Sequence, residues 1–319
     1  MIPCPSATTA SRSAYHHEAF LWSGIDTFLA RTVPFVLDAV TSGAPVLVAV
    51  TVAREAALRD ALGSDAENVT FRDMNVLGRN PARIIPAWLD FVAEHRDAGV
   101  PLRGIGEPIW AGRRDSELTE CQIHEAMLNV AIPTDVPLWL LCPYDVDSLS
   151  ADVLDEARRS HPSVDHDLSG TAASPAYRGS DHARRLSRGD LVEPAGLVEE
   201  LVVARGTLSA VRALVARHGA QAGLGANQID DLRLALTEVA ANSMDHGAGH
   251  GVLRAWREPH ALVFEVRDHG EITDLLAGRT TPSPEQARGR GLWLVNQLCD
   301  LLQIRSTGRG TVVRVHTWL

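Results

Sequence analysis

The sequence predicts two domains, an N-terminal α/β domain built on an open sheet and a C-terminal α+β sandwich. The chain has 319 residues, more than the roughly 250–300 that one hydrophobic core usually supports. Apolar strands and helices alternate over the first half, whereas helices and β-hairpins make up the second half. Residues 162–190 between the halves are rich in Ser, Gly, Asp and Arg, which favours a linker.

In the N-terminal half, residues 14–161, the run PVLVAVT at 45–51 is typical of a buried parallel strand, because it is short, apolar and β-branched. The hydrophobic pattern predicts further strands at 69–73 and 137–142 and helices at 27–40, 84–95 and 116–130. Such alternation indicates an open sheet with helices on both faces.

In the C-terminal half, residues 191–319, the spacing of apolar positions predicts helices at 207–218, 226–245 and 292–302. Strands are expected at 252–256 and 262–266, followed by a closing hairpin of residues 303–305 and 311–316 around Gly308 and Gly310. Helices that cover one face of such a sheet form an α+β sandwich.

The composition argues against several classes of function. A formal net charge of −10 argues against direct binding to nucleic acids or to anionic membranes. All 30 basic residues are arginines, so the chain has no lysine for a phosphate-binding P-loop. No apolar stretch reaches the length of a membrane span, and residues 1–13 lack the apolar core of a signal peptide. We therefore expect a cytoplasmic protein.

The cysteines give no sign of a metal centre or a disulfide framework. Cys4, Cys121, Cys142 and Cys299 lie far apart in the sequence, and no Cys-x-x-Cys pair occurs. We expect neither a zinc site nor a structural disulfide in this reduced protein.

One polar stripe on an expected helix has the residue types of a nucleotide site. Glu238, Asn242 and His246 recur every four residues and so lie on one helix face, while Leu232, Leu236 and Val239 can pack on the sheet. An amide oxygen is a fair Mg²⁺ ligand, and a carboxylate one turn away can orient or deprotonate a hydroxyl. Alone, such a stripe is more often a solvated helix face.

Two later segments have features that suit a nucleotide. Asp268 and Gly270 end an apolar strand, where a carboxylate can accept a hydrogen bond from an adenine amino group. The second segment, Gly289-Arg290-Gly291-Leu292, leads into a helix whose free N–H groups suit phosphates. Each pattern alone is weak, since Asp-x-Gly is usually a simple turn.

The three segments together resemble the GHKL superfamily, with its N-box, Asp-x-Gly adenine box and Gly-x-Gly-Leu box. The short loop at 271–287 and the run RGRGLWLVNQLCD are most similar to the anti-sigma-factor serine kinases. The resemblance implies a Bergerat fold, which binds ATP with Mg²⁺. It also implies a general base at Glu238, a Mg²⁺ ligand at Asn242, an adenine-binding carboxylate at Asp268 and phosphate contacts at Gly289 and Gly291.

Further residues follow from the same resemblance. Thr311 takes the family's late Gly-Thr position near the adenine, and Gly270, Arg290 and Leu292 complete the motifs. His246 ends the helix motif, where a capping role is an equal alternative. The expected partners are a sigma factor, an anti-sigma antagonist protein or both, and the family often forms homodimers. A non-catalytic ATP-binding switch and a histidine-kinase-type sensor are the alternatives, and the latter needs a phosphoacceptor helix that the sequence does not reveal.

The N-terminal half resembles the MEDS sensory domain, which is related to the RecA/KaiC ATPase fold. The similar segments are 17–22, 78–83, 106–110, 121–129 and 141–145. The turn at 41–45 precedes a strand and has no lysine, so we expect no nucleotide hydrolysis here. Glu107, His124 and Glu125 are candidates for binding a small-molecule ligand. The alternative is that these polar residues only hold loops together.

Overall fold

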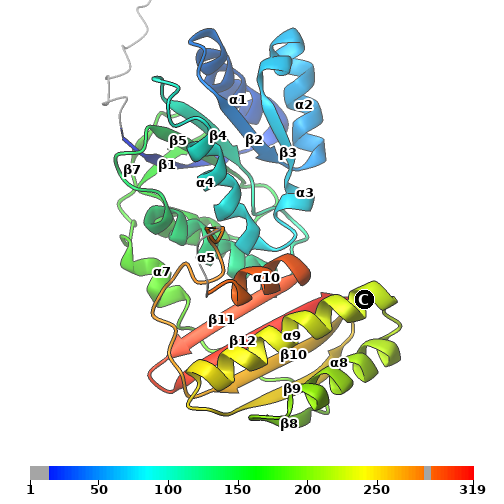
Figure 1. The fold of residues 1–319 in the computed structure, drawn as a ribbon. Helices are drawn as coiled ribbons and strands as arrows, with labels where there is room; N and C mark the ends of the chain where they lie inside the picture. Colours follow the sequence, from blue (N-terminus) through cyan, green and yellow to red (C-terminus); the bar gives the residue numbers. More distant parts are fainter. Residues whose placement is uncertain (1–13, 284–288) are drawn as a thin grey trace, which may run out of the picture. The chain divides into compact units, whose positions relative to one another are not determined.

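The computed structural model describes residues 14–283 and 289–319, which form two compact units (Figure 1). The first unit comprises residues 14–76, 89–112 and 129–179. The second comprises 77–88, 113–128 and 180–319. The prediction of two domains is thereby confirmed, although the second unit includes two segments from the N-terminal half. Cys4 and residues 284–288 of the expected loop lie outside the described residues.

The first unit is built on a seven-stranded sheet in the order β3-β2-β4-β5-β1-β6-β7. All neighbouring strands are parallel except β7, which runs antiparallel to β6. The predicted open α/β sheet is therefore confirmed. The strands are β1 (His16–Trp22), β2 (Val46–Val50), β3 (Thr70–Asp73), β4 (Leu102–Gly106), β5 (Leu138–Asp145), β6 (Ser163–His166) and β7 (Ala172–Ala173).

Helices connect these strands, as parallel neighbours require. Phe28, Phe35 and Val36 of α1 pack against Phe20 and Trp22 of β1 in one buried cluster, which anchors α1 to one face of the sheet. The α-helices of this part of the chain are α1 (Gly24–Thr41), α2 (Val52–Leu62), α3 (Met74–Leu77), α4 (Ile84–Glu94), α5 (Asp115–Ala131), α6 (Ala151–Ser160) and α7 (Asp181–Leu186). Short 3₁₀ helices cover Gly63–Asn68 and Pro81–Arg83.

One expectation about a connecting segment needs revision. The segment 162–190, expected to be a linker, contains β6, β7 and α7, and β6 pairs with β1 in the first unit. The turn at 41–45 joins α1 to β2, whereas the turn from β1 into α1 is Ser23-Gly24. There the Asp147 carboxylate accepts hydrogen bonds from Ser23 Oγ at 2.9 Å and Gly24 N at 3.1 Å. A carboxylate therefore binds the N-terminus of this helix, where a P-loop protein binds phosphate.

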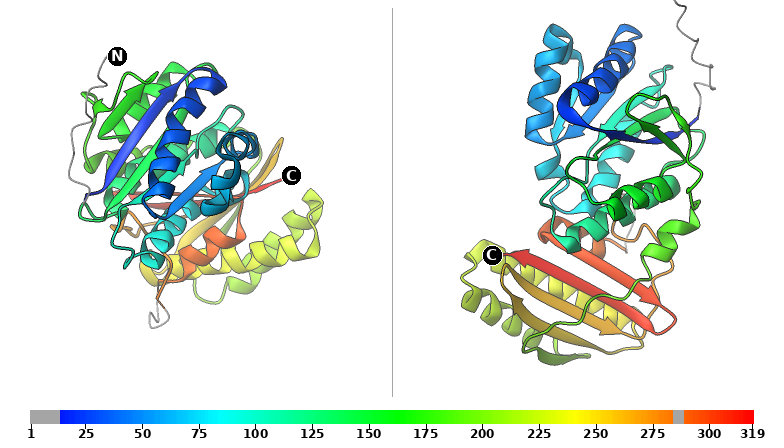
Figure 2. Two further views of the ribbon diagram at one scale, coloured as in Figure 1. Left: turned by 90° about the horizontal axis from the view of Figure 1, so that it is seen from above. Right: turned by 180° about the vertical axis from the view of Figure 1, so that it is seen from behind.

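The second unit contains a five-stranded antiparallel sheet in the order β11-β12-β10-β9-β8. Its strands are β8 (Glu199–Val203), β9 (Gly251–Glu258), β10 (Ala261–Asp268), β11 (Leu301–Thr307) and β12 (Gly310–Trp318). Figure 1 shows α8 (Leu208–Ala222), α9 (Ala226–His246) and α10 (Gly291–Leu298) on one face of this sheet, which confirms the α+β arrangement. The right-hand view of Figure 2 shows the opposite face of the same sheet. The helix expected at 292–302 was too long, because Leu301 and Leu302 begin β11.

The core of this unit lies between the helices and the sheet. Leu232, Leu236 and Val239 of α9 are buried with Phe264 and Val266 of β10, as the helix periodicity predicted. Because these residues occupy the sheet-facing side, the polar stripe of α9 is directed away from the core. The same packing determines where the end of α9 lies relative to the end of β10.

The face of the sheet opposite the helices holds a buried charge. Glu265 is fully buried and accepts hydrogen bonds from Arg254, Arg267 and Arg314 at 2.6–2.8 Å. Burial raises the pKa of Glu265, but the hydrogen bonds and positive charges of these arginines outweigh it and hold the pKa below its usual value. The carboxylate therefore stays ionised inside the sheet at neutral pH.

Two segments from the N-terminal half complete the second unit. Arg83 lies at the C-terminus of α10, where its guanidinium donates to the carbonyl oxygens of Asn296 at 2.8 Å, Gln297 at 2.8 Å and Cys299 at 3.1 Å. Unpaired carbonyls at a helix end are favourable positions for a cation. Arg83 therefore caps α10 from a distant part of the sequence.

Asn296 connects that cap to the loop after β10. Its side-chain oxygen accepts from Asn80 Nδ2 at 3.0 Å, and its amide donates to the Gly278 carbonyl at 2.8 Å. Nearby, the buried Glu120 carboxylate pairs with Arg279 at 3.0 Å and Arg305 at 2.7 Å.

None of the helices within residues 14–283 and 289–319 is both long and apolar enough to cross a membrane.

We predict that His316 makes the unfolding free energy depend on pH. His316 is buried in β12 beside Gln303, and burial together with the Arg314 charge lowers its pKa to about 3. The unfolded chain binds a proton near pH 6.5 whereas the native state stays neutral, so stability is complete above pH 6.5 and decreases toward pH 3. From pH 7 to pH 5 this residue alone should cost about 2 kcal/mol.

Urea unfolding of the full chain tests this expectation. The difference in unfolding free energy between wild type and His316→Gln should shrink by about 2 kcal/mol from pH 7 to pH 5. His260→Gln, at an exposed position, is the control and should leave the pH dependence unchanged. Parallel pH curves for wild type and His316→Gln would contradict the prediction.

Candidate functional site

A cavity of about 490 Å³ opens beside the C-terminal half of α9 in the second unit. Its volume falls within the range of small-molecule and cofactor sites. It brings together the three segments that the sequence singled out. Eight of the predicted site residues line it, namely Asn242, His246, Asp268, Gly270, Gly289, Gly291, Leu292 and Thr311.

The polar stripe of α9 forms one wall of this site. Asn242 and Glu238 are half-buried, and His246 is exposed in the last turn. Glu238 does not line the cavity, but it lies at its margin against Gly291: a Cβ atom on Gly291 would be 3.0 Å from Glu238 Oε2 and 3.1 Å from Asn242 Nδ2. The missing side chain at Gly291 therefore lets the start of α10 approach both polar groups.

Asp268 stands at the end of β10, with Gly251 of β9 and Thr311 of β12 as its neighbours across the sheet. Its Oδ1 accepts a hydrogen bond from Gly270 N at 2.8 Å, and Thr311 Oγ1 donates to the Gly270 carbonyl at 2.9 Å. These bonds fix the turn after β10 and orient the Asp268 carboxylate. Thr311 was named from the motif alone, and the strand register explains its position.

Glycines surround the Asp268 carboxylate because no larger residue fits. A Cβ on Gly247 would lie 2.5 Å from Asp268 Cγ, and a Cβ on Gly270 would overlap the His246 carbonyl oxygen. A Cβ on Gly251 would overlap the Ser243 hydroxyl. The end of α9 and the end of β10 are thus in direct backbone contact, which leaves a cradle of backbone atoms around one carboxylate.

Ser243 was missed by the sequence reasoning. It is buried on α9, lines the cavity, and its hydroxyl has no hydrogen-bond partner within the described part of the chain. A buried hydroxyl normally has a partner, so it suits a polar atom of a bound molecule or of water. Ser243 directly follows Asn242, and that position was the one feature of the sequence that could have identified it. The helical pattern, however, indicated only a position in the core.

The turn before α10 forms the far side of the site. Gly289 has a φ of 85°, in the left-handed region that favours glycine. Arg290 precedes the first turn of α10, and its Nη2 donates to the Ser283 carbonyl at 3.1 Å, so it contacts the loop and does not line the cavity. The first N–H groups of α10, at Gly291 and Leu292, have no helical partner and suit an anion.

The loop after β10 closes the cavity on its remaining side. Ile272 N donates to Ser306 Oγ at 2.8 Å, and Ser306 bonds Thr311, so the loop is tied to the hairpin. Gly278 packs closely on Leu292, since a Cβ there would be 2.9 Å from Leu292 Cβ. The sequence analysis assigned no role to the residues of this loop that line the cavity, which are Glu271, Ile272, Thr273, Asp274, Ala277, Gly278, Thr280 and Pro282.

The polar candidates of the N-terminal half have separate surroundings. The Glu107 carboxylate accepts from Thr51 N at 3.1 Å and Thr51 Oγ1 at 3.0 Å, with Arg54 nearby. Burial raises the Glu107 pKa although these contacts oppose the shift. This supports the loop-holding alternative for Glu107. His124 and Glu125 are both buried on α5.

Comparison with known proteins assigns both halves of the chain. The family described as MEDS (MEthanogen/methylotroph, DcmR Sensory domain) matches residues 16–162. The family described as histidine kinase-like ATPase domain matches residues 203–317. The chain is therefore a MEDS sensory domain followed by a GHKL-type ATPase domain, a class that binds ATP.

The similar proteins each cover little more than a third of this chain. Two proteins named anti-sigma F factor, from Thermoanaerobacter sp. (strain X514) and Thermoanaerobacter pseudethanolicus, are each 28% identical over 121 residues. Each match covers 35% of this chain and 85% of the relative. A crystal structure of the RsbU and RsbW domains of Rv1364c from Mycobacterium tuberculosis aligns at 18% identity with a TM-score of 0.30, over 38% of this chain and 32% of that one.

We predict that adding one methyl group at Gly310 disrupts the hairpin beside the site. Gly310 has a φ of 127°, and a Cβ there would overlap the Asp268 carbonyl oxygen, which cannot move without breaking the β10–β12 pairing. Gly310→Ala should lower the unfolding free energy of the full chain by about 2–4 kcal/mol in urea unfolding. Gly308→Ala is a matched control, because nothing lies within 4 Å of the added Cβ. Equal stability of the two variants would contradict the prediction.

Proposed function

We propose that the chain is an ATP-dependent anti-sigma factor that phosphorylates a serine of an antagonist protein, under the control of its MEDS domain. The observation that carries this proposal is the single cavity in which all three nucleotide motifs meet. The likeness to the anti-sigma F factors supports the partner class, a sigma factor and an anti-sigma antagonist.

The adenine end is assigned to the region around Asp268. Its Oδ1 is engaged by Gly270 N, so Oδ2 is the atom for an adenine amino group. Because Gly247 and Gly270 have no side chains, a flat base can approach the backbone there. The buried Ser243 hydroxyl offers a further polar contact. Thr311, bonded to the Gly270 carbonyl, holds the same turn from β12. The donors and the space present thus fit a purine base.

The phosphate end is assigned to the start of α10. The backbone N–H groups at Gly289, Gly291 and Leu292 suit phosphate oxygens, with the helix dipole adding to the attraction. Asn242 would hold Mg²⁺ through its amide oxygen, and that ion supplies charge neutralisation to phosphates. His246 and Arg290 are assigned to the entrance, since both are exposed.

Glu238 is assigned as the general base. In the proposed reaction the serine oxygen of the antagonist forms a bond to the γ-phosphorus of ATP, its proton passes to a Glu238 oxygen, and the bond between the γ-phosphorus and the bridging oxygen breaks to release ADP. Its position at the cavity margin, beside Gly291, suits a group that meets a hydroxyl arriving from outside.

The N-terminal domain is assigned as a RecA/KaiC-like sensor without nucleotide hydrolysis. The Asp147 carboxylate at the start of α1 supports this, because it would repel a phosphate there. A ligand could regulate the ATPase domain only by binding two conformations with different affinity. Within the second unit, the contacts of Arg83 and Glu120 are candidates for the interactions that such a ligand would change.

We predict that Asp268→Asn weakens ATP binding roughly 10- to 100-fold, the equivalent of about 1.5–3 kcal/mol. Asparagine keeps an oxygen for Gly270 N but presents an amide donor to the adenine amino group. Titration calorimetry of the full chain with ATP and Mg²⁺ measures the change. Asp245→Asn, at an exposed position near the end of α9, should bind as wild type. Equal affinities for wild type and Asp268→Asn would place adenine elsewhere.

We predict that Glu238→Ala keeps ATP binding but slows phosphate transfer by roughly 10²- to 10⁴-fold, because a general base contributes about that much. Labelled transfer to a cognate antagonist is the assay. Asp231→Ala, an exposed acidic position earlier on α9, serves as the control. Unchanged transfer in Glu238→Ala would assign the base to another residue. If the wild type binds ATP but transfers nothing, the protein is instead a non-catalytic ATP-binding switch.

A further inference from the structure

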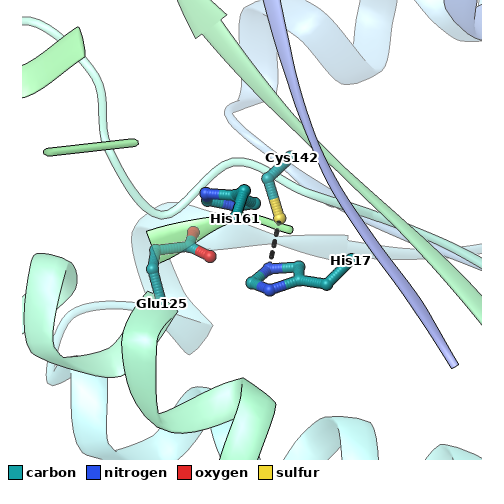
Figure 3. Close-up of side chains that lie close together, drawn as sticks. All are labelled: His17, Glu125, Cys142 and His161. Carbon is teal, nitrogen blue, oxygen red and sulfur yellow. Dashed lines mark hydrogen bonds between the residues drawn. The ribbon is translucent and has the colours of Figure 1, made fainter. Parts of the chain in front are cut away.

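Four buried side chains with metal-ligating atoms lie close together within residues 16–162, the segment that matches the MEDS family. They are His17 of β1, Cys142 of β5, His161 directly after α6, and Glu125 of α5. Each offers one ligand atom, and these atoms all lie within 4.8 Å of one another. Figure 3 shows the two imidazoles, the thiol and the carboxylate close together, with a dashed line for the contact between His17 and Cys142.

The fold explains why residues so distant in sequence meet. β1 and β5 are parallel neighbours, and the register pairs His17 with Leu140 and Ala19 with Cys142. His17 and Cys142 are therefore diagonal neighbours on the same sheet face. α5 is one continuous helix, and Glu125 lies one turn before Asn129, so both side chains share a helix face. The sequence argued against a zinc site because it showed no Cys-x-x-Cys spacing, and a site assembled from four elements has none.

The separation between the Cys142 and His17 ligand atoms fits a small tetrahedral ion. The Sγ of Cys142 lies 3.5 Å from Nε2 of His17. Ligand bonds of about 2.0–2.3 Å around zinc place neighbouring ligand atoms roughly 3.3–3.8 Å apart. The rings of His17 and His161 are 4.1 Å apart between centroids, so the two imidazoles are in direct contact.

Both imidazoles are oriented as metal ligands usually are. Nδ1 of His17 lies 3.1 Å from Asn129 Oδ1, and Nδ1 of His161 lies 2.8 Å from the Ala157 carbonyl oxygen. A metal-bound histidine typically donates its second ring N–H to such an oxygen, which fixes the tautomer and leaves the other nitrogen for the ion. Asn129 also donates to the Ser160 carbonyl at 2.8 Å, so it is itself held in place.

We propose that His17, Glu125, Cys142 and His161 form a structural zinc site in the MEDS domain. Two imidazoles, one thiolate and one carboxylate are a donor set that suits Zn²⁺. All four residues are at most 1% exposed, so the site is closed to solvent and its four protein ligands complete a tetrahedron. The ion would join β1, β5, α5 and the end of α6, and its binding would stabilise this domain.

Metal analysis of the purified full chain tests the proposal. Elemental analysis should find about one zinc ion per chain, and Cys142→Ala and His161→Gln should each lose most of it. Cys121→Ala is the matched control, because Cys121 of α5 is as buried as Cys142 but does not belong to the cluster of four ligands. Zinc content that is negligible in wild type, or unchanged in both ligand variants, would overturn the proposal, as would another element bound at these ligands.

Cobalt substitution gives a test that does not depend on the folding of variants. After chelation and addition of Co²⁺, the wild type and Cys121→Ala should show strong visible bands of a four-coordinate ion and a thiolate charge-transfer band. Folded Cys142→Ala should lack the charge-transfer band. If wild type shows only the weak spectrum of hydrated Co²⁺, the proposal fails whatever the variants do.

The hydrogen bond between His17 Nδ1 and Asn129 Oδ1 provides an independent test. Asn129 positions His17, so Asn129→Ala should weaken zinc binding about 10- to 100-fold in competition with a chromophoric chelator, while about one ion still binds. Unchanged affinity would contradict the assigned orientation of His17. ATP affinity is not expected to depend on this site, so these results are separable from the proposed kinase activity.

Discussion

The position of α10 depends on a buried asparagine. Asn296 bonds Asn80 through its oxygen and the Gly278 carbonyl through its amide, so one side chain joins the helix end to the loop after β10. Arg83 then satisfies three carbonyl oxygens of the same helix terminus. Helix ends leave such groups without helical partners, and burying them unpaired costs about 1–3 kcal/mol each. The contacts therefore determine where this short helix can lie.

The shape of the cavity beside α9 depends on that placement. Because the C-terminal end of α10 is fixed by Asn296, its first residue, Gly291, is held against Glu238 and Asn242. Gly278 packs on Leu292 from the loop side. The cavity between these elements is consequently bounded by packed backbone, which is the condition for holding phosphates in one geometry. Flexible surface loops alone would not supply it.

The sequence predicted the fold well where local periodicity and burial agree. Leu232, Leu236 and Val239 identified the inner face of α9, and the stripe that includes Asn242 then followed from helix geometry. Local patterns could not reveal contacts that depend on tertiary structure. Ser243 was indistinguishable from a core serine, α10 was extended into β11 because Leu301 and Leu302 continue an apolar run, and the cluster around His17 requires strand register to be known.

Arg83, which caps the end of α10, limits how the two halves of the chain can be recombined with other domains. Arg83 lies in the segment that matches the MEDS family, as does Glu120, which neutralises Arg279 and Arg305. A recombinant ATPase segment starting near residue 191 would carry two buried cations without their counter-charge and a helix end without its donor. The two halves therefore cannot be exchanged as independent domains. Grafting this ATPase segment onto a different sensor would require replacements for both charged partners, Arg83 and Glu120.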